Sequence, residues 1–389
     1  MMNRICNILL FLAFSLTGCV TQFIPDTGEE DKALVIEGRI TDRNETYEVQ
    51  VSALQPVYPE STVPDVPLYN VSVFDHEGRE YIFSHAGNGK YLSDSTEFLA
   101  MAGIKYKLRV EGNGQLYESD YVEMKPVPCI DSVYAGPEYN EFYRPGETTW
   151  GYQVYLDSYD PSGECRYFMW TFTETWEFRY PWRSPWILNR ICWKSAVSTD
   201  INILSTSSLE ESRVVRQPIA FITNETDRLI VRYSILVRQH SVSDEEFVYR
   251  ENLRRTVFEA GGLYDAIPGS IQGNIKRIDD PSEQVLGFFG VSAVSEKRIF
   301  IENVQHQFPS FYAYCPIDTV PVADYDPGSL GPNVYILTEF WEPPASPRYI
   351  LTIRRECIDC SLVGTSNEPD YWNDPVQAKN TYLLSHEEH

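Results

Sequence analysis

The chain has 389 residues, of which 56 are acidic and 32 are Lys or Arg, so its net charge is −24. This balance argues against nucleic acid as a partner, because phosphate binding needs clustered Lys and Arg, and against electrostatic docking on anionic lipid head groups. Apolar residues make up 43% of the chain and aromatic residues 14%, which is enough for a folded core and typical of β-rich proteins.

The first predicted element is a signal peptide over residues 1–18. Arg4 supplies its positive charge, and Ile8–Leu16 is an apolar run that is too short for the roughly 20 residues of a membrane-spanning helix. The run ends in Leu16-Thr17-Gly18-Cys19, which resembles the bacterial lipobox, in which the cysteine sulfur receives a diacylglycerol. Cys19 is therefore the predicted lipid attachment point to a membrane. The alternative is an ordinary signal peptide followed by an accidental cysteine.

Residues 19–32 are predicted to be an acidic tether, and residues 33–126 to form a β-sandwich. Short segments in this domain alternate apolar and polar side chains, most cleanly in Ile104–Glu111, and turns such as Gly112-Asn113-Gly114 separate them. About seven short strands joined by such turns are typical of a sandwich. Met124–Pro128 then predicts an extended linker to the next domain.

Residues 127–372 are predicted to form a larger β-rich, sandwich-like domain, followed by a polar tail over residues 373–389. Its apparent strands include Trp150–Asp157, Cys165–Phe178 and Leu229–Gln239. Long segments with alternating or continuous apolar residues favour strands that are half or fully buried.

One α-helix is expected within this domain, at about 243–260. Ser243 is a favourable N-cap, and Glu246 follows three residues later, as in a capping box. Gly261-Gly262 supplies the stop signal. The residues that share the apolar face of the helix are Tyr249, Leu253, Val257 and Ala260.

The cysteines indicate disulfides. Cys6 leaves with the signal peptide, and Cys19 takes the lipid. Six cysteines in an exported chain fit three disulfides, with 15 possible pairings. Within the C-x-x-C motif Cys357-Ile358-Asp359-Cys360, a structural disulfide is favoured over a redox dithiol or half a zinc site, because neither a following helix pattern nor a second motif is present. The disulfide candidates are Cys129, Cys165, Cys192, Cys315, Cys357 and Cys360.

The motifs of catalysis are absent from the sequence. There is no P-loop and no nucleophile elbow, and His76-Glu77 lacks the second histidine of a zinc-protease helix. Asp157, Asp160 and Glu164 cluster around a turn but do not match a calcium-binding EF-hand loop. No catalytic residue, metal or cofactor is therefore predicted.

A loop rich in aromatic residues is the best candidate for binding a ligand or partner. Prolines interrupt the segment after the strand Cys165–Phe178, and rings on a loop are suited to recognition. The alternative is a loop that folds back and caps the sandwich. The candidate residues are Tyr180, Trp182, Arg183 and Trp186.

Several short stretches carry a family resemblance through their order and spacing. They are Val35-Ile36-Glu37-Gly38, Cys192-Trp193, Arg232-Tyr233-Ser234 through Val237-Arg238-Gln239, Ile267-Pro268 with Gly273-Asn274-Ile275, Val285-Leu286-Gly287-Phe288-Phe289, Lys297-Arg298-Ile299 and Arg354 through Cys360, with Pro369 and Trp372 after them. Together they resemble one family of lipoproteins of the Bacteroidota, known as a domain of unknown function and commonly encoded beside TonB-dependent outer-membrane receptors.

The resemblance implies an outer-membrane anchor and, from gene neighbourhood, an accessory role for a β-barrel receptor. It offers no activity or functional residue. The first domain resembles the immunoglobulin-like or transthyretin-like modules of such receptors. Because the other four cysteines occupy family positions, the resemblance implies that the extra Cys129 and Cys165 pair with each other. Glu29-Glu30-Asp31 resembles the phylum's export signal to the outer leaflet, which favours a surface-facing body over a periplasm-facing one.

The sequence thus predicts a lipid-anchored, mainly β protein of the outer membrane that is not an enzyme. Its expected role is an accessory or ligand-capturing partner of a TonB-dependent transporter, with the ligand unidentified. The first alternative is a free-standing surface module that binds a glycan or a protein through the Tyr180–Trp186 loop. The second alternative is a hydrolase of unrecognised type.

Overall fold

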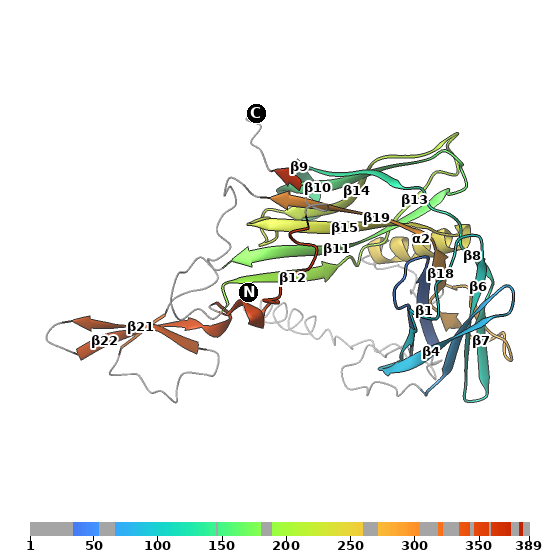
Figure 1. Cartoon of the computed structure of the whole chain (residues 1–389), viewed down its shortest axis with the longest axis horizontal. Helices are drawn as coiled ribbons and strands as arrows, with labels where there is room; N and C mark the ends of the chain where they lie inside the picture. The colour runs from blue at the N-terminus through green and yellow to red at the C-terminus, as the bar shows by residue number, and fades with distance from the viewer. Residues whose placement is uncertain are drawn as a thin grey trace, which may run out of the picture.

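The computed structural model describes residues 34–53, 67–144, 147–179, 189–259, 271–302, 318–321, 334–342, 346–357, 359–374 and 381–383. Within these residues the protein is mainly β, with four sheets and one α-helix, α2 (Asp244–Glu259), which confirms the predicted fold class. Figure 1 shows two sandwich-like bodies with α2 at their junction and a small sheet standing apart from both.

The first body is a sheet of 11 strands, which we call sheet A. Its main path runs β16-β7-β6-β3-β4-β5-β2-β1-β17, with β18 paired to β1 and β8 paired to β6. Along β6, Tyr106, Leu108 and Val110 are buried whereas Lys105 and Glu111 are exposed, so the predicted alternation is confirmed. The strands are β1 (Leu34–Thr41), β2 (Glu48–Ala53), β3 (Asn70–Asp75), β4 (Glu80–Gly87), β5 (Lys90–Ser93), β6 (Lys105–Gly112), β7 (Gln115–Ser119), β8 (Val122–Glu123), β16 (Ile275–Arg277), β17 (Val285–Leu286) and β18 (Phe289–Ser292).

Sheet A contains strands from both sides of the predicted domain boundary at residue 126. Residues 275–292 lie far along the chain, yet β16 pairs with β7, and β17 and β18 pair in parallel with β1. Phe289 and Val291 are buried in the same core as Ile36 and Ile40. A parallel pair requires a long crossover connection, and a local sequence pattern gives no sign of it.

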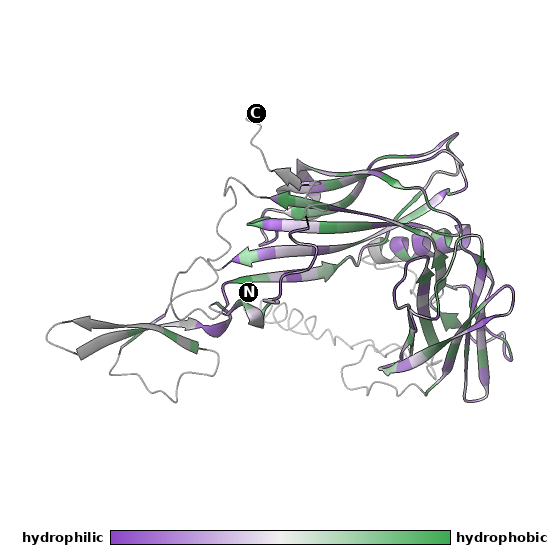
Figure 2. Ribbon diagram, in the orientation of Figure 1, coloured by the Kyte–Doolittle hydropathy of each residue, from purple (hydrophilic) through white to green (hydrophobic). Residues whose placement is uncertain are grey.

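The second body is a sandwich of two sheets. Sheet B has the order β14-β10-β9, and sheet C has the order β12-β11-β15-β19-β23, with β13 paired to β11. Val154 and Leu156 from sheet B meet Trp170, Tyr233 and Ile235 from sheet C in one core. Figure 2 shows hydrophobic segments, in green, interspersed with hydrophilic segments along the strands of both bodies. The strands are β9 (Ile130–Arg144), β10 (Glu147–Asp160), β11 (Tyr167–Arg179), β12 (Ile191–Val197), β13 (Asn202–Ser205), β14 (Ser212–Thr223), β15 (Arg232–Ser241), β19 (Val294–Glu302) and β23 (Thr381–Leu383).

The small separate sheet consists of β20 (Asp318–Pro321), β21 (Val334–Glu342) and β22 (Ser346–Arg354). β21 and β22 pair antiparallel, which confirms the hairpin that the sequence predicts at Val334–Phe340 and Arg348–Arg355. The short 3-10 helices η4 (Arg355–Cys357) and η5 (Cys360–Leu362) follow it.

Helix α2 starts where the sequence predicts, but its capping box is only half formed. The Ser243 hydroxyl accepts a hydrogen bond from the Glu246 backbone N–H at 3.1 Å, as an N-cap does. The Glu246 carboxylate does not turn back to the helix start. It pairs instead with Arg39 of β1 and with Arg250, because two guanidinium groups hold a buried carboxylate more strongly than one backbone N–H.

Candidate ligand pocket beneath a C-terminal strap

Residues 359–374, which we call the strap, cross the outer face of sheet C. Successive side chains of a strand point to opposite faces. In β19, Ile299 and Ile301 enter the core between sheets B and C, whereas Phe300 packs with Trp193 and Trp372 in a separate cluster. Trp372 therefore covers the face of sheet C that sheet B leaves open.

Covalent and backbone contacts anchor the strap to β12. A disulfide joins Cys360 of the strap to Cys192, with 5.8 Å between the Cα atoms. Trp193 and Thr365 exchange two backbone hydrogen bonds of 2.8 and 2.9 Å. The strap is thus fixed at its start by the disulfide and near its end by the Trp372 ring, which lies 6.3 Å from the Trp193 ring and 5.7 Å from the Phe300 ring between centroids.

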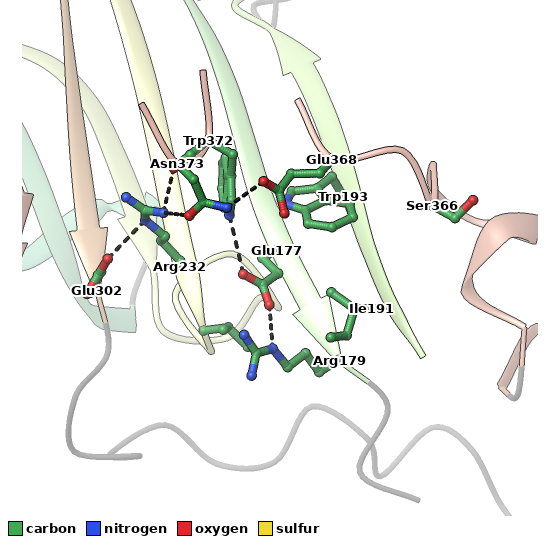
Figure 3. A pocket seen from close by; sticks show the side chains of 11 residues that line it. Glu177, Arg179, Ile191, Trp193, Arg232, Glu302, Ser366, Glu368, Trp372 and Asn373 are labelled. Carbon is green, nitrogen blue, oxygen red and sulfur yellow. Dashed lines mark hydrogen bonds and ion pairs between the residues drawn. The ribbon is translucent and has the colours of Figure 1, made fainter. Parts of the chain in front are cut away.

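A cavity of about 580 Å³ opens between the strap and the ends of β11, β12, β15 and β19 (Figure 3). Such a volume is typical of small-molecule sites, which occupy about 300–1,000 Å³. Its lining residues are Glu177, Arg179, Ile191, Trp193, Val231, Arg232, Glu302, Ser366, Glu368, Trp372 and Asn373.

Glu177 is the most deeply placed carboxylate of the pocket. Only 5% of this residue is exposed. One carboxylate oxygen pairs with Arg179, and the other accepts a hydrogen bond of 3.4 Å from the indole N–H of Trp372. Charge-assisted bonds of this kind offset the cost of burying a carboxylate. Glu177 thereby links the wall of β11 to the strap.

Arg232 forms a second link between sheet C and the strap. Its Nε lies 3.0 Å from Glu302, and its Nη1 donates to the backbone carbonyl of Trp372 at 2.6 Å. The guanidinium also stacks over the Phe300 ring at 4.2 Å and near the Trp372 ring at 5.3 Å. Such planar stacking suits arginine better than lysine, and it fixes the floor of the pocket.

Three further side chains add polar groups to the lining. Glu368 of the strap accepts a hydrogen bond from the Asn373 side-chain amide. Trp193 is buried, and its indole nitrogen has no hydrogen-bond partner within the described part of the chain. An indole N–H usually finds a partner when buried, so this nitrogen is an unsatisfied donor in a residue that lines the pocket.

A second buried polar cluster joins the two bodies away from the pocket. Glu246 lies between Arg39 and Arg250, the second at 2.9 Å. Burial alone would raise the pKa of Glu246, but the charges of Arg39 and Arg250 outweigh it and lower that pKa. Burial, with Arg39, Arg238 and Arg250, lowers the pKa of His240 well below its ordinary value. This histidine is therefore neutral.

The cysteines confirm that the C-x-x-C motif is structural and correct the expected pairing of Cys129 with Cys165. Cys360 pairs with Cys192. Cys357 is also disulfide-bonded, to a partner outside the described residues. The two cysteines of the motif therefore do not pair with each other. Cys129 and Cys165 are free thiols and do not pair. Cys129 is exposed, whereas Cys165 is enclosed in the core, where burial and the nearby Asp160 charge raise its pKa to about 12. A thiol with such a pKa is inert.

The acidic turn near Asp160 serves the local backbone. Asp160 accepts hydrogen bonds from the backbone N–H groups of Ser162 at 3.0 Å and Cys165 at 2.8 Å. Asp157 instead accepts from the Arg216 backbone N–H at 2.6 Å. Among the described residues no group of three His, Cys, Asp or Glu side chains is placed to hold a metal ion.

The remaining predicted site residues lie outside the described part of the chain. They are Cys19, Cys315 and the loop residues Tyr180, Trp182, Arg183 and Trp186. The loop follows directly on Arg179, a pocket residue, and the described chain resumes at Asn189, two residues before Ile191 of the pocket.

The sequence did not predict the pocket, although one signal was available. Glu177 interrupts the aromatic strand Cys165–Phe178, and a charge within such a strand is unusual unless it is paired. One partner, Arg179, lies two residues away in the sequence, but the other, Trp372, lies 195 residues away. The pattern of the strand alone therefore could not reveal the site.

The described residues contain no helix that is both long and apolar enough to cross a membrane. No curated protein sequence matches the chain. A family model described as "Domain of unknown function (DUF4249)" matches residues 20–298, which include both sandwich bodies as far as β19 and exclude the strap. The match covers well over half of the sequence and confirms the resemblance to a family of unknown function: the chain belongs to the DUF4249 family.

Proposed function

We propose that this protein is a lipid-anchored lipoprotein of the outer membrane that captures a ligand without chemically changing it and presents it to a TonB-dependent transporter. The observation that carries the capture role is the pocket beneath the strap. Its walls are fixed by a disulfide and by paired charges, so the site is preorganised. A preorganised site binds with a smaller loss of conformational freedom.

The sequence supports the location. The lipobox-like segment ending at Cys19 would confine the folded body to the membrane that holds the transporter. Confinement raises the effective concentration of two partners without any new contact between them. The transporter as partner is supported by the lipoprotein-family resemblance, and the surface-facing orientation by Glu29-Glu30-Asp31.

Affinity purification from native membranes tests this role. The tagged wild-type protein should incorporate labelled palmitate and bring down a β-barrel receptor. The Cys19→Ala variant is the control and should appear in the soluble fraction without the receptor. A wild-type preparation that carries palmitate but no receptor would contradict the transporter role.

A free-standing glycan- or protein-binding module is the second candidate. It is favoured by the chain connectivity, because the Tyr180–Trp186 loop begins immediately after Arg179 of the pocket. The double variant Trp182→Ala, Trp186→Ala should then lose ligand binding while the protein stays in the membrane. Unchanged ligand binding in this variant would show that the two loop tryptophans do not bind the ligand.

A further inference from the structure

Most charged side chains that line the pocket form ion pairs with one another. Glu177 pairs with Arg179, and Glu302 pairs with Arg232. Glu368 is the remaining ionisable side chain of the lining, and within the described residues its carboxylate accepts from the Asn373 amide and forms no ion pair. Three carboxylates against two guanidinium groups leave the lining nearly neutral, with no concentrated charge for a charged ligand.

The groups that remain for a ligand are a mixture of donors and acceptors. Trp193 offers a buried indole N–H without a partner in the described chain. Arg179 uses its Nε on Glu177, and 51% of its side chain is exposed. Glu302 and Glu368 each use only Oε1 in the contacts above. A hydroxyl group both donates and accepts, so a ligand with several hydroxyls satisfies this mixture.

We propose, on the basis of the proposed capture function, that the pocket binds a neutral polyhydroxylated ligand: a sugar or the end of a neutral glycan. An anion would face three carboxylates and a cation two guanidinium groups, and a charge buried without a partner is costly. The Trp193 and Trp372 rings are almost fully covered, at 7% and 2% exposure. Recognition is therefore by hydrogen bonds, with little ring stacking.

The first test uses the mature lipoprotein in detergent on an array of neutral glycans, acidic glycans, and acidic and basic peptides. A neutral glycan should give the strongest signal. Its dissociation constant, measured by titration, should change less than about twofold between low and high salt, because no net charge is neutralised on binding. A strongest signal from a charged ligand, with marked salt dependence, would overturn the proposal.

Three substitutions then locate the ligand and define its charge. Trp193→Phe keeps a ring but removes the N–H, and it should weaken binding roughly 3- to 10-fold, as the loss of one hydrogen bond does. Arg179→Gln and Glu368→Gln change the pocket charge in opposite directions. A neutral ligand should bind somewhat more weakly to both variants, whereas a charged ligand would bind more weakly to one and more tightly to the other.

Arg213→Gln is the matched control for Arg179→Gln. Its side chain is also 51% exposed and pairs with a nearby glutamate, Glu211, but it does not line the pocket. It should leave binding unchanged, and melting curves should show that all four variants fold. If a charged ligand responds to the pocket variants, the ligand class is wrong and the capture function stands. If no ligand of any class responds to them, both fail.

Discussion

Among single residues, Glu246 is a buried charge at the junction between the two bodies. It is completely buried and pairs with Arg39 of β1 and Arg250 of α2. Removing one partner of a buried ion pair leaves the other charge uncompensated and costs about 3–5 kcal/mol. The sequence showed Glu246 only as a capping residue, because Arg39 lies more than 200 positions away.

Glu246→Gln should therefore lower the free energy of unfolding by about 3 kcal/mol, measured by urea denaturation. Glu251→Gln is the control on the same helix, since Glu251 pairs with Arg254 and Arg255 near the surface. That change should cost less than about 1 kcal/mol. Equal losses in the two variants would show that the junction pair contributes no more to stability than a pair near the surface.

His240 should make stability depend on pH. Its two ring nitrogens pair with Thr171 at 3.0 Å and Ser292 at 3.1 Å. The charged groups around it are Arg39, Arg238 and Arg250, with Glu246 bonded to the first. The folded protein keeps this ring neutral because its pKa is lowered well below the ordinary value, whereas the unfolded chain takes up a proton near pH 6.5.

Stability should accordingly fall as the pH drops below about 6.5, by up to about 1.4 kcal/mol per pH unit from this residue. Urea denaturation at pH 7.5, 6.5 and 5.5 measures the slope. His240→Gln should flatten it, and His76→Gln, in an exposed turn, should not. A slope that survives His240→Gln would assign the pH dependence to other groups.

Among the structural elements, the strap is the one that the sequence pattern did not predict. Residues 359–374 contain no long strand or helix pattern, and the contacts that position them cross a sequence distance of 168 residues at the disulfide. The helix, by contrast, was predicted nearly to its ends, because Ser243 and the apolar spacing are local signals. Local signals predict single helices and strands. Which cysteines pair, and which segment covers a sheet, depends on contacts between residues that are distant in the sequence.

Removing the disulfide should release the strap. The double variant Cys192→Ala, Cys360→Ala should lose about 2–4 kcal/mol of stability, and hydrogen exchange at Thr365 and Trp372 should rise more than in the rest of sheet C. Cys129→Ser, which removes an exposed free thiol, is the control. Unchanged exchange in the strap would mean that its hydrogen bonds and the Trp372 ring hold it without the disulfide.

At the scale of the whole molecule, the two bodies are one interleaved structure. The mainly β class and the sandwich of residues 33–126 were predictable from period-two patterns and turns, but the return of residues 275–292 to β1 was not. The strands β17 and β18 are too short for a clear sequence pattern, and their position in the sheet is set by pairing with β1. The order of segments along the sequence therefore does not show that the first sheet is built from two distant parts of the chain.

A fragment of residues 34–126 should consequently not form a stable sandwich by itself. It lacks Phe289 and Val291 of the core and the parallel partners of β1, so that edge of the sheet would be left open. Circular dichroism and amide-proton dispersion should show an unfolded or aggregated fragment. A cooperative thermal transition in this fragment would support residue 126 as a domain boundary.

The proposed ligand site is the face of sheet C beneath the strap. A photo-cross-linking residue placed at Ile191, on the rim of the pocket and 40% exposed, tests it directly in native membranes. The same residue at Ile278, exposed beyond β16 of the first body, is the comparison. We expect a glycan adduct from position 191 and none from position 278. An adduct from position 278 alone would contradict it.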